Sequence, residues 1–178
     1  MIVAKRKPMA EIAEMVAPYK KVKIIGCRSC VAICLAGGEK EVKTLVSALR
    51  LKAKKEGRRQ EFEGLVVERQ CEKEWVEEVE DRIMDSDLVL SMACSLGAQT
   101  IGDMYPKKLV FPALNTGIFG VPEEQGVWSE KCVGCGNCII HTTGGICPIA
   151  RCAKSMLNGP CGGSSNGKSG MLGVALSL

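Results

Sequence analysis

The sequence predicts an α/β fold: a small, doubly wound domain on a parallel sheet, followed by a Cys/Gly-rich, mostly irregular and helical domain. Over the first 115 residues, four short runs rich in Val, Ile and Leu alternate with helical patterns. This is typical of parallel strands covered on both faces. From residue 127 the chain is dense in Cys and Gly, with almost no strand pattern. We therefore expect domains at 1–115 and 127–178, joined by a linker at 116–126.

The expected elements follow from apolar spacing in the first domain. Near-continuous apolar runs predict buried strands at Val22–Gly26, Leu65–Arg69, Leu88–Ala93 and Leu109–Pro112. Apolar residues recur at helical spacing in Met9–Ala17, Glu39–Lys55, Glu72–Met84 and Ala98–Met104. The alternation of the two kinds of element favours a doubly wound arrangement. The second domain is too short and too rich in Gly to bury much core, so we expect a metal to stabilise it.

The amino-acid composition argues against several classes of protein function. Aromatic residues make up only 4% of the chain and the net charge is +4, which argues against a module that stacks nucleic-acid bases. No apolar segment reaches the roughly 18 residues that cross a membrane. Residues 1–20 lack the apolar core of a signal peptide, so we expect a cytoplasmic protein. The eleven cysteines are an odd number, and in a reducing compartment they remain thiols available as metal ligands.

The C-terminal cysteines have the spacing of a bacterial ferredoxin. Cys132, Cys135 and Cys138 form a Cys-x2-Cys-x2-Cys run with interspersed glycines, which lets backbone N–H groups point at cluster sulfurs. Cys147, followed by Pro148, is the expected fourth ligand of a 4Fe–4S cluster, and Cys152 and Cys161 are alternatives. A zinc site is the competing interpretation because zinc also takes four cysteines.

A second set of cysteines follows the predicted strands. Cys27, Cys71 and Cys94 come after the first, second and third strand, and ligands gather at the carboxyl ends of parallel strands. Cys30 is the expected fourth ligand because it lies in the adjoining turn. Cys34 is either a further candidate or a buried core thiol. The sequence thus predicts two 4Fe–4S clusters, or alternatively one cluster plus zinc.

The chain also resembles a known family. The run from Cys27 through Cys34 to Val42 resembles the start of the MetV-type small subunit, the C-terminal-type (zinc or iron–sulfur) domain family of methylenetetrahydrofolate reductase. The second half is similar as well, from Cys132 to Cys138, through Thr143–Lys154, and on to Asn158–Gly163. The resemblance covers about residues 7–168.

The resemblance implies a non-catalytic, cytoplasmic subunit of an oxidoreductase complex in the one-carbon metabolism of acetogens, in the acetyl-CoA pathway. Its partner would be a flavin-containing catalytic subunit, with FMN or FAD on that partner and possibly a further electron-donor subunit; no nucleic acid or membrane is expected. We find no catalytic constellation in the chain itself. The expected function is electron transfer between an external donor and the partner's flavin. The alternative is a zinc-stabilised structural or docking subunit of the same complex.

Overall fold

The computed structural model describes residues 1–152, 164–165 and 168–169. Cys161, one of the alternative ligands, lies outside the described residues. The chain divides into two compact units, Met1–Gly117 and Ile118–Leu178. The predicted α/β class is confirmed, because the first unit contains a four-stranded parallel sheet with helices packed against it.

The strand order of this sheet positions the candidate site. Its strands are β2 (Lys21–Cys27), β3 (Glu61–Val67), β4 (Leu88–Met92) and β5 (Leu109–Pro112), in the order β3-β2-β4-β5 and all parallel. From β2 the chain crosses to one side to form β3 and then to the other side to form β4. The order therefore reverses between β2 and β4, and ligands of open α/β sheets bind beside the carboxyl ends at such a point.

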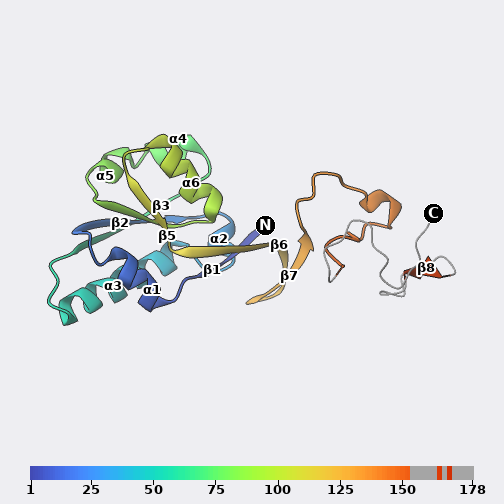
Figure 1. The fold of residues 1–178 in the computed structure, drawn as a ribbon, viewed down its shortest axis with the longest axis horizontal. Coiled ribbons are helices and arrows are strands. Elements are labelled where there is room, and N and C mark those ends of the chain that lie inside the picture. The colour runs from blue at the N-terminus through green and yellow to red at the C-terminus, as the bar shows by residue number, and fades with distance from the viewer. Residues whose placement is uncertain (153–163, 166–167, 170–178) are drawn as a thin grey trace. The chain divides into compact units, whose positions relative to one another are not determined.

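Helices cover both faces of the sheet (Figure 1). One apolar core packs α1 (Met9–Val16) and α3 (Glu39–Lys55) against the face that carries Ile24. The other packs α4 (Lys73–Glu77), α5 (Glu80–Met84) and α6 (Ser95–Met104) against the face that carries Ile25. Neighbouring residues of β2 thus serve opposite cores, since side chains alternate along a strand. A short helix, α2 (Cys30–Ile33), follows β2.

The structure departs from the sequence-based expectations outside this sheet. Strand β1 (Ile2–Arg6) was not expected, and it forms a second sheet with β6 (Leu114–Glu124) and β7 (Val127–Cys132), in the order β1-β6-β7. Most of the expected linker at 116–126 therefore lies in a strand. Register shifts at Phe119/Gly120 and Pro122/Glu124 break the alternation of side chains that would have revealed β6 in the sequence.

The remainder of the second unit contains short elements. A 3-10 helix spans Ile140–Thr142, and the two-residue strands β8 (Ser164–Ser165) and β9 (Lys168–Ser169) pair antiparallel. Across the parts of the chain that the structure describes, we find no helix with the length and apolar character needed to cross a membrane.

Candidate metal centres

Three cysteines gather at the carboxyl edge of the parallel sheet. Cys27 ends β2, and Cys71 and Cys94 follow the ends of β3 and β4. Cys27 and Cys94 are buried and Cys71 is exposed. Partial burial raises the pKa of the Cys71 thiol, and negative charge on Cys27 and Cys94 raises it further. The structure thus places these three residues at the same edge of the sheet, at or after the carboxyl ends of neighbouring strands.

Cys30 and Cys34 have different surroundings from these three. Burial disfavours ionisation of the half-buried Cys30 thiol, but hydrogen bonds from the backbone of Ile2 and from Ser29 outweigh it and lower its pKa. Cys34 is buried, and its Sγ lies 3.6 Å from the carbonyl oxygens of both Ala4 and Val31. Burial raises the pKa of the Cys34 thiol. These contacts make Cys34 a part of the core, which is one of the two interpretations that the sequence left open.

The loop between α2 and α3 is fitted closely to the strand ends. The Cys27 amide donates to the Gly37 carbonyl at 3.0 Å, and the Arg28 amide donates to the Val67 carbonyl at 3.0 Å. A Cβ at Gly37 would lie 1.8 Å from the Met92 carbonyl oxygen, so only glycine lets the loop approach β4 this closely. Backbone hydrogen bonds to the loop and to the end of β3 thus fix the chain at Cys27 and Arg28.

Two buried polar residues beneath these thiols were not anticipated from the sequence. Gln70 precedes Cys71, Ser91 lies in β4, and both side chains are fully buried. The Ser91 hydroxyl donates to Gln70 Oε1 at 2.7 Å, and Gln70 Nε2 donates to the Ile25 carbonyl at 2.6 Å. The only signal in the sequence is the single serine within the apolar run Leu88–Ala93.

In the second unit, four cysteines line one hollow of about 330 Å³. They are the four that the sequence grouped together: Cys132, Cys135, Cys138 and Cys147. Cys132 ends β7, and the next two follow it in an exposed loop. The rest of the wall is mainly apolar and includes Ile139, Ile140 and Ile149. Four cysteines thus line a common hollow whose other walls are mainly apolar.

The backbone of this loop supplies donors to the sulfurs. Gly134 and Gly136 have φ values of 64° and 80°, in the left-handed region that favours glycine. The Gly134 amide donates to Cys132 Sγ at 3.4 Å, and the Ala150 amide donates to Cys147 Sγ at 3.4 Å. Each of these two N–H groups favours negative charge on the sulfur that it contacts. Cys152, whose amide donates to the Ile149 carbonyl, does not line the hollow.

The donor sets suit a group bound by thiolates, although the side chains are not arranged around a single point. Within residues 1–152 and the short β8–β9 pair, no three His, Cys, Asp or Glu side chains are close enough together to hold one metal ion. Soft thiolate ligands select zinc, Cu(I) and iron–sulfur clusters. The residues of the hollow fit such a group through four thiols and two N–H donors to sulfur.

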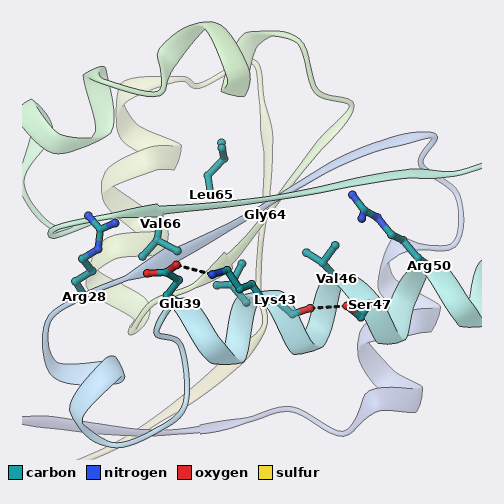
Figure 2. Close-up of a pocket in the computed structure, with 10 residues that line it drawn as sticks. Arg28, Glu39, Lys43, Val46, Ser47, Arg50, Gly64, Leu65 and Val66 are labelled. Atoms are coloured by element: carbon teal, nitrogen blue, oxygen red, sulfur yellow. Dashed lines mark hydrogen bonds and ion pairs between the residues drawn. The ribbon is translucent and has the colours of Figure 1, made fainter.

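A separate groove of about 500 Å³ lies between α3 and the edge strand β3 (Figure 2). Two of its cationic side chains are engaged with the protein itself. Lys43 pairs with Glu39 at 2.6 Å, and Arg50 donates to the Phe62 carbonyl at 2.6 Å. The groove is lined by positive charge from Arg28, Lys43 and Arg50 without presenting a thiol, so the candidate metal ligands all lie elsewhere.

The part of the chain that contains the hollow and the ferredoxin-like cysteine spacing also matches a known family. Residues 111–171 match the family described as methylene-tetrahydrofolate reductase C terminal. This confirms the resemblance noted from the sequence. The matched range contains every C-terminal cysteine, from Cys132 to Cys161. Neither a curated protein nor a solved structure matches the chain. The methylene-tetrahydrofolate reductase C-terminal family is thus the relationship that the comparisons support.

Proposed function

We propose that the chain is an iron–sulfur electron-transfer subunit of a methylenetetrahydrofolate reductase complex. It would relay electrons between an external donor and the flavin of a catalytic partner subunit. The observation that carries this proposal is the hollow that Cys132, Cys135, Cys138 and Cys147 line, within a segment that matches the reductase C-terminal family. Bound iron–sulfur clusters would supply one-electron chemistry.

The residues of the hollow would hold a cluster in three ways. The four thiolates would act as its ligands. The Gly134 and Ala150 amides, each 3.4 Å from a cysteine sulfur, would offset negative charge on those sulfurs. The apolar wall that includes Ile139, Ile140 and Ile149 would limit water at the site, and exclusion of water is one of the factors that set a cluster's potential.

The spacing of the cysteines favours a cluster over a single zinc ion. A Cys-x2-Cys pair suits zinc well, whereas a third cysteine two residues further on is the spacing of a bacterial ferredoxin. Cys132, Cys135 and Cys138 have this spacing.

The strand-end thiols would form the second site. Cys27, Cys71 and Cys94 lie at or after the carboxyl ends of three neighbouring strands, and negative charge on Cys27 and Cys94 raises the pKa of Cys71. Cys30 follows in the adjoining turn, and its lowered pKa favours the thiolate that binds metal. We therefore assign these four as the ligands of the N-terminal cluster, with Cys34 left in the core.

Metal analysis of the anaerobically purified chain tests this proposal. We expect a brown protein with about eight irons per chain, four for each cluster, and broad absorption near roughly 400 nm that bleaches on reduction. A colourless protein with stoichiometric zinc would contradict the proposal and would favour the structural or docking role.

Two cysteine variants sharpen the test. Cys135→Ser should lose about half of the iron, because it removes one ligand of one of two four-iron sites. It should also abolish reduction of the partner's flavin while the complex still assembles. Cys34→Ala is the matched control: it removes a cysteine whose sulfur contacts core carbonyls, so iron content should stay at the wild-type level.

A further inference from the structure

We propose that Gln70 and Ser91 are positioning residues that hold Cys27, Cys71 and Cys94 in mutual register before any metal binds. The inference deepens the proposed function, since it concerns the thiols of the N-terminal site. It rests on the hydrogen bonds of a single buried carboxamide that reaches all three cysteine-bearing strand ends.

The first step is the geometry of the carboxamide. Gln70 adjoins Cys71 in the loop after β3. Its Nε2 donates at 2.6 Å to the carbonyl of Ile25 in β2, two residues before Cys27. Its Oε1 accepts at 2.7 Å from the hydroxyl of Ser91 in β4, three residues before Cys94. One side chain thus ties together the ends of β3, β2 and β4.

The second step is the energetic asymmetry of buried polar groups. Both side chains are fully buried, and a buried polar atom without a partner costs more than its hydrogen bond contributes. The Gln70 carboxamide therefore has one orientation in which both Nε2 and Oε1 are hydrogen-bonded. The Ser91 hydroxyl also accepts from the Ala93 amide at 3.3 Å, which extends the constraint along the backbone to the residue before Cys94.

The third step is the packing of α6 on this network. A Cβ at Gly97 would lie 2.6 Å from Gln70 Cβ and 2.9 Å from Ala93 Cβ. The helix that begins beside Cys94 is therefore pressed directly against Gln70, and only a glycine permits that approach. Packing and hydrogen bonding thus fix the same side chain.

Preorganisation explains what the network would do. Thiols on three separate strands can form one site only while the ends of those strands stay in register. If the strand ends are not ordered beforehand, part of the free energy of metal binding is used to order them. A network that orders the strand ends in the metal-free chain removes this cost.

A metal-free readout separates this inference from the proposed function. Dibromobimane bridges two thiols that lie close together, and peptide mapping by mass spectrometry identifies the bridged pair. In the reduced, metal-free full-length chain, we expect bridges from Cys71 to Cys27 or Cys94. Gln70→Leu removes two hydrogen bonds and should lower their yield at least about fivefold, the factor that corresponds to about 1 kcal/mol for one net hydrogen bond.

Two controls keep the result specific. Ser91→Val and Ser91→Thr have nearly the same shape but differ in the hydroxyl, so Val should lower the yield as Gln70→Leu does while Thr retains it. Gln60→Leu removes hydrogen bonds to the Val16 and Tyr19 carbonyls, remote from the thiols, and should leave the yield unchanged. If Gln70→Leu does not fold, the comparison of Ser91→Val with Ser91→Thr still tests the inference.

Iron content gives the second readout. In anaerobically prepared protein, Gln70→Leu and Ser91→Val should lose iron from the N-terminal site only, and Ser91→Thr should keep it. Folded Gln70→Leu or Ser91→Val with wild-type bridging would overturn the inference, as would equal yields for Ser91→Thr and Ser91→Val. A wild-type chain that binds no iron but shows the expected bridging pattern would contradict the proposed function and leave the inference standing.

Discussion

At the residue scale, one carboxylate secures the end of β2 opposite the thiols. The Asp87 side chain accepts the amides of Lys20 and Lys21 at 3.0 and 2.8 Å. The hydrogen bond from the Lys21 backbone is the main cause that lowers the pKa of Asp87. Because this pKa is lower in the folded chain than in the unfolded one, the stabilisation is present above the unfolded value. It is lost as the pH falls through the folded value.

The stability of Asp87→Asn should therefore depend less on pH in the acid range than the stability of the wild type does. The variant should be less stable than wild type at pH 7, and the difference should shrink below about pH 4, the ordinary range of an unfolded aspartate. Urea unfolding at a series of pH values measures this. Asp103→Asn, which changes an exposed carboxylate on α6, is the control and should follow the wild-type curve. A constant gap between Asp87→Asn and wild type at every pH would contradict the assignment.

Single residues of the candidate sites were predictable to different degrees. The place of Cys27, Cys71 and Cys94 at one edge of the sheet followed from their position after parallel strands, because the carboxyl ends of such strands share an edge. The partnership of Gln70 with Ser91 did not follow, because it joins residues far apart in the chain and depends on atomic geometry. A serine in an apolar strand indicates a buried hydrogen bond, but it does not identify the partner.

At the scale of elements, helix α6 shows how contact decides the role of a glycine. Gly97 faces Gln70 and Ala93 in close contact, whereas a Cβ at Gly102 would have no atom within 4 Å apart from its chain neighbours and the backbone of its own helix. Both glycines belong to the same ten-residue helix. Their helix propensities are equal, so a difference between them reports packing alone.

Alanine at the two positions should therefore act in opposite directions. Gly97→Ala should destabilise the chain by about 1–3 kcal/mol, the ordinary cost of overpacking. Gly102→Ala should stabilise it by about 0.5–1 kcal/mol, because alanine is the better helix former. Thermal or urea unfolding of both variants measures the difference. Similar shifts of the same sign would show that α6 does not pack closely on Gln70.

The predicted elements agree with the structure to different degrees. The bounds of α3 (Glu39–Lys55) and β5 (Leu109–Pro112) agree with the prediction. Edge strand β3 begins four residues earlier than expected, at Glu61, because an edge tolerates charged residues. The helix expected over Glu72–Met84 breaks into α4 and α5 near Val79. The apolar residues keep their helical spacing across this break because Val76 and Ile83 pack in the same core.

At the scale of the whole molecule, the two units have unlike interiors. The first buries two extensive apolar clusters against its sheet. Among the described residues of the second unit up to Cys152, only Gly120 and Ile149 are buried. So little buried apolar surface gives a small stabilisation, and small domains of this kind depend on metals or other cross-links.

Limited proteolysis should therefore reveal a metal-dependent second unit. In the metal-free chain, trypsin should cleave after Lys131 and Arg151 well before it degrades residues 1–117, because metal binding and folding are coupled in such sites. Anaerobic reconstitution with iron and sulfide should protect both positions, and peptide mapping would follow the cuts. Cys135→Ser, treated identically, should stay susceptible. Equal cleavage with and without reconstitution would show that the second unit does not need metal for its order.

The different spacing of the two thiol sets has a consequence for synthesis on the ribosome. Cys132, Cys135 and Cys138 are close together in any conformation of a nascent chain, because few residues separate them. Cys27, Cys71 and Cys94 come to the same edge of the sheet only after β2, β3 and β4 have paired. The C-terminal thiols can therefore capture a soft ion, including adventitious zinc, from an unfolded polypeptide, whereas the strand-end site stays closed to metal until the sheet has formed.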